Sequence, residues 1–256
     1  MKIYFKLFII LGVAATGLGA YLFFRKPSVS APSVSLTAPH ASTVSPASTT
    51  LITPEASIPP TPSPEPINQL PGEAALTVTY TMQAPFNKWD ALHEDACEEA
   101  SLVMVKHFLD GTVLASPEQA DKEITDLVNF EVKNDYGPSI TLQELKEVAN
   151  LYFGLKNGTV KQVTSVNDIK KLVTSGHPVI LGMAGKLLPN PYFSNGGPNY
   201  HMLIVKGYDA SGFITNEPGT WHGDGFHYSY QTFYNAIHDW NPSNILTRSK
   251  EGLVFE

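Results

Sequence analysis

The chain has one cysteine, Cys97, among its 256 residues. A single cysteine cannot form an internal disulfide, so the fold is not held by covalent cross-links. Metal-ligand spacing is also missing, because no two of the eight histidines pair at such a spacing with a carboxylate in support. The sequence therefore predicts a domain without a bound metal or other cofactor.

Positive charge is scarce as well. The chain has 17 lysines and arginines against 24 aspartates and glutamates, which gives a formal net charge of −7 at pH 7. No cluster of basic residues interrupts this balance, and Arg25 with Lys26 is too short a pair to recognise lipid headgroups. This distribution argues against nucleic acid as a partner.

Residues 7–24 contain no charged side chain at all. Lys2 and Lys6 precede this apolar run and Arg25 and Lys26 follow it, with aromatic residues near both ends. The run is just long enough to span a bilayer and long for the core of a signal peptide. We expect an uncleaved membrane anchor over residues 1–26; the alternative is a signal peptide cleaved after the weak site at 29–31.

Residues 27–73 have a composition that cannot bury a core. Serine, threonine, proline and alanine dominate the stretch, and prolines crowd its end at 59–66. Such a composition favours a disordered, extended stalk. A stalk that follows an anchor is most useful outside the cell. We therefore expect a single-pass protein of the cell membrane with an extracytoplasmic domain, or a secreted protein if the anchor is cleaved.

Globular patterning begins at residue 74, so we expect one folded domain over 74–256. Strict alternation predicts a strand at 75–81, and apolar spacing with capping residues predicts helices at 97–109, 117–132, 142–152 and after Ser165. Apolar runs then predict strands at 179–183, 200–209 and 213–219, the last two as a hairpin, with shorter strands near 160–163 and 226–228. Helices first and an antiparallel sheet afterwards indicate an α+β fold.

Cys97 opens the first of these helices, where free backbone N–H groups and the helix dipole favour a thiolate. A nucleophilic thiol needs a histidine-like base and a group that orients the base. His201 begins a strong strand, and Asn216 and Glu217 lie about sixteen residues further on. Successive strand residues point to opposite faces, so only one of those two can orient His201. Glu98 and Glu99, which directly follow the thiol, would raise its pKa.

Four runs carry a family resemblance: DACEEASLVM at 95–104, GHPVI at 176–180, YHMLIVKGYD at 200–209 and ITNEPG at 214–219. In this order and spacing they resemble the bacterial C-thirty-nine-like cysteine peptidases, which are papain-like relatives of the double-glycine leader peptidases that process bacteriocins. The resemblance spans about 78–240. It implies a papain-like fold, with Cys97 as nucleophile and His201 as general base and acid. Glu217 stands where the family usually has the aspartate of an Asp-Pro pair, and Asn216 is the alternative third residue.

The resemblance has departures. The leader peptidases have an oxyanion-hole glutamine about six residues before the cysteine, and here that residue is Ala91. Gln83 is the nearest upstream glutamine and is our candidate donor. Members of the family often have Cys-Gly-Pro where this chain has Cys-Glu-Glu. The expected substrate is a peptide or protein. The alternatives are a peptide-binding or wall-binding module without catalysis, and an amidase or endopeptidase acting on cell-wall peptides.

Overall fold

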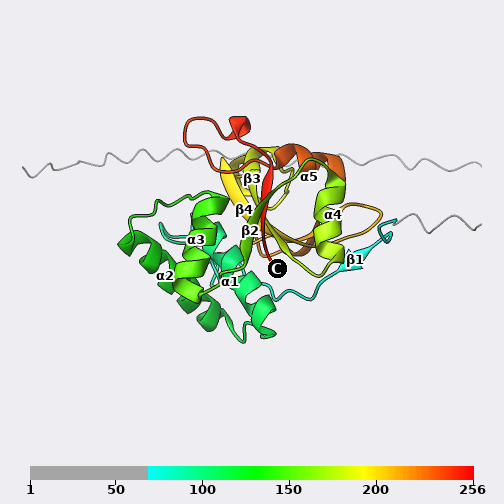
Figure 1. Cartoon of the computed structure of the whole chain (residues 1–256). Coiled ribbons are helices and arrows are strands. Elements are labelled where there is room, and N and C mark those ends of the chain that lie inside the picture. Colours follow the sequence, from blue (N-terminus) through cyan, green and yellow to red (C-terminus); the bar gives the residue numbers. More distant parts are fainter. Residues whose placement is uncertain (1–68) are drawn as a thin grey trace, which may run out of the picture. The chain divides into compact units, whose positions relative to one another are not determined.

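An antiparallel sheet forms the centre of the structure, a computed structural model that describes residues 69–256 (Figure 1). The sheet has seven strands in the order β2-β7-β3-β4-β5-β6, with β1 pairing beside β4. The strands are β1 (Ala74–Ala75), β2 (Gly158–Gln162), β3 (Val179–Ala184), β4 (Tyr200–Tyr208), β5 (Phe213–Asn216), β6 (Asp224–Tyr228) and β7 (Glu251–Phe255).

Helices cover both faces of this sheet. They are α1 (Cys97–Asp110), α2 (Pro117–Lys133), α3 (Leu142–Phe153), α4 (Val166–Thr174) and α5 (Tyr230–Ala236), with single 3₁₀ turns at Gly185–Leu187, Ser194–Gly196 and Ile245–Thr247. Figure 1 shows α1, α2 and α3 grouped together, away from α4 and α5. Side chains of the central strands alternate between two cores: Ile204 packs with α1 to α3, while Leu203 and Val205 pack with α4 and α5. The predicted α+β class is confirmed.

Local capping chemistry sets the helix boundaries. The Ser116 side chain accepts a hydrogen bond from the backbone N–H of Gln119 at the start of α2, and Thr141 forms a full capping box at the start of α3. Gly111 and Gly154 adopt the left-handed conformation directly after α1 and α3. The four helices predicted in the first half of the domain are therefore present within a residue or two of their expected ends.

The strand predicted at 75–81 is wrong for most of its length. β1 contains only Ala74 and Ala75, which pair with Tyr208 and Gly207 of β4. Next to these positions β4 is already paired on both sides, with β3 and with β5. The segment after Ala75 therefore has no free strand edge, although the predicted alternation still buries Val78.

Two further differences concern the sheet. The hairpin strand predicted at 213–219 ends at Asn216, and the residues after it form a turn. The C-terminal strand β7 was not predicted, yet it lies between β2 and β3. Its apolar run is only three residues long and its partners are distant in sequence, so no local pattern marked it.

The predicted anchor at 1–26 and nearly all of the stalk at 27–73 lie outside the described residues. Across 69–256, no helix combines the length and the apolar character that crossing a bilayer would need. The anchor and the stalk therefore stay predictions.

Candidate active site

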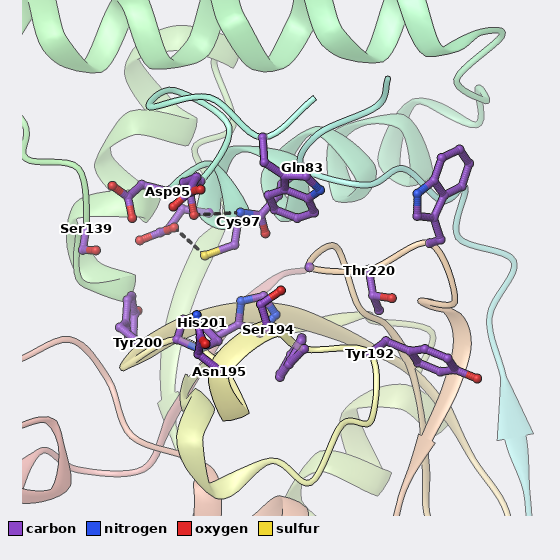
Figure 2. A pocket seen from close by; sticks show the side chains of 18 of the residues that line it. Gln83, Asp95, Cys97, Ser139, Tyr192, Ser194, Asn195, Tyr200, His201 and Thr220 are labelled. Carbon is purple, nitrogen blue, oxygen red and sulfur yellow. Dashed lines mark hydrogen bonds between the residues drawn. The ribbon is translucent and has the colours of Figure 1, made fainter. Parts of the chain in front are cut away.

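A cleft of about 630 Å³ opens beside the first residue of α1. Three of the five predicted site residues line it, namely Cys97, His201 and Gln83. The other lining residues are Asn87, Trp89, Glu94, Asp95, Glu98, Ser139, Tyr192, Phe193, Ser194, Asn195, Gly197, Pro198, Tyr200, Gly219, Thr220 and Trp221. In Figure 2, Cys97 and His201 reach the cleft from opposite walls.

The sequence places Cys97 where the helix begins. The residue before it, Ala96, has no side chain that could cap the helix, so the first backbone N–H groups of α1 are not satisfied by a capping side chain. Cys97 itself is buried and packs with the core under α1. The thiol thus lies at the positive end of the helix dipole, as the sequence predicted.

The immediate surroundings of the thiol oppose its ionisation. Burial raises the pKa of Cys97 well above its usual value, and the neighbouring Glu98 adds to the rise by its charge and its hydrogen bond. The thiol donates to Oε2 of Glu98 at 2.8 Å. The Glu99 charge acts in the same direction, and the backbone N–H of Met202 opposes them by donating to the sulfur. In this arrangement the thiol holds its proton.

Acidic side chains continue behind the thiol into the core. Glu98 also accepts a hydrogen bond from the backbone N–H of Ile140 at 3.4 Å. Glu99 and Glu131, from α1 and α2, are buried and in hydrogen-bond contact through their carboxyl groups. Two carboxyl groups can share such a bond only when one is protonated. Burial is the largest cause that raises the pKa of both groups. The charge of Glu99 adds to the rise at Glu131, whereas the bond to Glu131 opposes the rise at Glu99.

His201 is the second residue of β4 and is only 2% exposed. Its Nε2 is hydrogen-bonded to Oε1 of Glu217, which leaves Nδ1 as the ring nitrogen available to the cleft. The Phe193 ring and the imidazole form a T-shaped pair, with the ring centroids 5.5 Å apart. Glu217 is held in turn by the backbone N–H of Gly219 at 3.0 Å and by the hydroxyl of Tyr228 at 3.0 Å. The pair is therefore fixed from several sides.

Asn216 lies elsewhere. Its amide donates to the carbonyl oxygens of Thr79 at 2.9 Å and Val78 at 3.3 Å, in the segment between β1 and α1. It is the last residue of β5, and its side chain points away from the side chain of the next residue, Glu217. Of the two alternatives left open by the sequence, the structure brings only Glu217 to His201.

Gln83 lines the cleft and is 3% exposed. Its Nε2 donates to the backbone carbonyls of His93 at 2.9 Å and Glu94 at 3.0 Å. Both amide protons are used, so the side chain offers its oxygen, and not a donor, to its other surroundings. Ala91, at the position of the family's glutamine, is exposed and is not part of the cleft lining.

Sequence reasoning missed the groups that hold Glu217. Tyr228 comes from β6 and receives a hydrogen bond from Asn190 at 2.9 Å. Gly219 leaves little room for a side chain, since a Cβ there would lie 3.2 Å from both Glu217 Oε1 and His201 Cε1 and would push on them. No local pattern marks these residues, because each acts only through a partner brought close by the sheet. Within residues 69–256, no group of three or more His, Cys, Asp or Glu residues is arranged to hold a metal ion.

The fold and the cleft together define a class. A buried thiol at a helix N-terminus shares a cleft with a histidine that is oriented by a carboxylate, and this is the arrangement of a thiol hydrolase. A family model described as the Peptidase_C39 like family matches residues 75–244, most of the chain. The chain belongs to this family and is a cysteine peptidase, as the sequence resemblance predicted.

Solved structures similar to the chain are distant in sequence. A C39-like peptidase from Bacillus anthracis is 16% identical, with a TM-score of 0.49 over 72% of this chain and 97% of that one. Xylellain, a cysteine protease from Xylella fastidiosa, is 16% identical, with a TM-score of 0.33 over 76% of this chain and 90% of that one. No curated protein matches the chain. The family assignment rests on the family model.

Proposed function

We propose that the chain is a membrane-anchored, extracytoplasmic cysteine peptidase that cleaves peptide bonds with Cys97, His201 and Glu217. The observation that carries the proposal is the His201–Glu217 contact in the wall of the cleft that also contains the Cys97 thiol. We include a papain-like fold in the same proposal. It is supported by the order of the three residues along the chain, with the cysteine first, the histidine second and the orienting carboxylate last.

In the proposed reaction, Nδ1 of His201 accepts the thiol proton and the Cys97 sulfur attacks the peptide carbonyl. Glu217, bound to Nε2, keeps the ring in place and offsets the charge of the imidazolium. The imidazolium then protonates the leaving amine. A water molecule, deprotonated by the same histidine, releases the acyl group from the sulfur.

The negative oxygen of the intermediate needs donors. The backbone N–H of Cys97, at the start of α1 where the residue before it provides no cap, supports this role. Gln83 was our predicted donor from the sequence, and its amide would have to turn away from the carbonyls of His93 and Glu94 to provide an N–H. The backbone N–H of Cys97 is therefore the donor that the geometry favours.

A direct test compares wild-type chain with Cys97→Ala on three sets of substrates. These are a mixed synthetic peptide library, a double-glycine leader peptide and purified cell-wall peptides. Cleavage by wild type and its loss in Cys97→Ala are expected, and the substrate set that is cleaved separates a leader peptidase from a wall endopeptidase or amidase. Cleavage that persists in Cys97→Ala would refute the proposed nucleophile.

The location is proposed from the sequence of residues 1–73 and is tested separately. The full chain is expected in the membrane fraction of cells, and a variant lacking residues 1–26 in the soluble fraction. Protease added outside intact cells should remove the domain from the full chain. A domain protected from that protease would place it inside the cell instead.

A further inference from the structure

The cleft differs in charge between its two ends. Among the residues that line it, the acidic ones are Glu94, Asp95 and Glu98, and no lysine or arginine joins them. Lys186, which contacts the neighbouring loop, donates to the backbone carbonyl of Gly197 at 2.9 Å and is not part of the lining. In Figure 2, Asp95 lies on one side of Cys97, while Thr220 and Tyr192 lie on the other.

Two of these acids have no cation to pair with. Glu94 and Asp95 are both exposed, and no salt bridge involves either of them among the described residues. Burial, and then the charge of Glu94, raise the pKa of Asp95. The two carboxylates thus repel each other at the cleft, and a positive charge placed between them would relieve that repulsion.

A second observation, independent of the acids, points to a ligand that donates hydrogen bonds. The Oε1 atom of Gln83 is buried and has no hydrogen-bond partner. Its orientation is fixed, because Nε2 is committed to two backbone carbonyls. Figure 2 shows the Gln83 side chain directed into the cleft beside Cys97. A buried acceptor without a donor is costly, so this atom calls for a donor from the substrate.

We propose that this end of the cleft is a subsite for a cationic group of the substrate, a lysine or arginine side chain or a free amine. Glu94 and Asp95 would supply the negative potential, and Gln83 Oε1 would accept a hydrogen bond from the same residue of the substrate. The inference rests on the proposed function, because it names the substrate class of that cleft. The enzyme therefore selects peptides with a positive charge near the bond that it cuts.

Cleavage of a mixed peptide library gives the first test. Fragments made by wild type and absent with Cys97→Ala are identified by mass spectrometry, and residues near each cut are counted. We expect the ratio of basic to acidic residues near the cuts to exceed the same ratio in the library. The double change Glu94→Gln with Asp95→Asn should reduce this ratio by about fivefold, which is the upper range for an exposed charge pair. Glu147→Gln, which removes an exposed charge outside the cleft, is the matched control. Equal cutting beside acidic and basic residues would overturn the subsite.

A second test needs no turnover and separates the failure of the subsite from the failure of the proposed function. Cys97 is the only thiol, so methanethiosulfonate reagents report on the cleft alone. The measured quantity is the rate with the trimethylammonioethyl reagent divided by the rate with the sulfonatoethyl reagent. We expect this ratio to exceed that of the urea-unfolded chain, and the double variant to lower it while Glu147→Gln does not.

The outcomes divide cleanly. A high ratio without any peptide cleavage would support the subsite and refute the peptidase proposal. A ratio equal to that of the unfolded chain would overturn the subsite even if peptides are cleaved. Complete protection of Cys97 from both reagents would show that the cleft is closed to solutes and would overturn the subsite as well.

Discussion

The Cys97 thiol donates a hydrogen bond to Oε2 of Glu98, the next residue in the chain, at 2.8 Å. This contact keeps the proton on the thiol, whereas the proposed nucleophile is the thiolate. The thiol must leave Glu98 before its proton can pass to His201. Burial and, after it, Glu98 therefore lower the amount of reactive thiolate present at neutral pH.

Glu98→Gln should lower the pKa of Cys97. Glutamine keeps the shape of the side chain but removes the negative charge, and its amide can donate to the thiolate. Because one pKa unit changes the thiolate fraction tenfold, we expect iodoacetamide to alkylate Cys97 about tenfold faster at pH 7. The rate is measured as a function of pH, with Glu147→Gln as control. An unchanged pH profile would show that Glu98 does not hold the thiol protonated.

The His201–Glu217 pair gives a second prediction. His201→Ala should reduce kcat/KM by about 10²- to 10⁴-fold, the usual contribution of a general acid–base group. Glu217→Gln should lower kcat and change KM little, because the imidazole ring loses the charge that stabilises its protonated form. Steady-state kinetics on whichever peptide the wild type cleaves provides the measurement. Full activity of Glu217→Gln would show that the Glu217 charge has no role in the reaction.

Asn216→Ala should behave differently from Glu217→Gln. The Asn216 amide ties the end of β5 to the backbone of Val78 and Thr79, so its loss leaves buried carbonyls without donors. We expect a loss of stability of about 1–3 kcal/mol. Urea unfolding measures this loss, and kcat/KM per folded molecule should fall far less than in Glu217→Gln. A stable but inactive Asn216→Ala would instead favour asparagine as the third residue.

The buried Glu99–Glu131 pair predicts how stability depends on pH. Both carboxyl groups have a raised pKa in the folded state, so the folded chain keeps protons that the unfolded chain releases. Their contribution to stability is complete below the unfolded value near 4.5 and is lost as pH rises through about 7, the pKa of Glu99, and beyond.

Glu131→Gln removes one of these groups while keeping a hydrogen-bond donor for Glu99. We expect this variant to gain about 1 kcal/mol or more relative to wild type at pH 8, and little at pH 4. Urea unfolding at the two pH values measures the difference. An identical gain at both pH values would mean that packing, and not the carboxyl pair, is responsible.

Much of the local structure could be predicted from the sequence because its causes are local. At the helix starts, Ser116 and Thr141 accept hydrogen bonds from backbone N–H groups only three residues away. At the helix ends, Gly111 and Gly154 bond to carbonyls only a few residues before them. The alternation after residue 74 correctly predicts that one face of this segment is buried, but the long strand that it also predicts is wrong. A strand also needs a neighbouring strand with an unpaired edge. Both edges of β4 are already hydrogen-bonded, one to β3 and the other to β5.

The amino-acid sequence alone predicts that Cys97 opens a helix, that His201 begins a strand, and that a carboxylate or an amide lies about sixteen residues further on. These statements depend on residue order and on the periods of helix and strand. The folded structure was needed to show that Glu217 contacts His201, that Tyr228 and Gly219 hold it there, and that the Gln83 amide faces the backbone carbonyls of residues 93 and 94. The reason is physical: each of these contacts depends on the direction of one side chain, which packing between distant elements fixes.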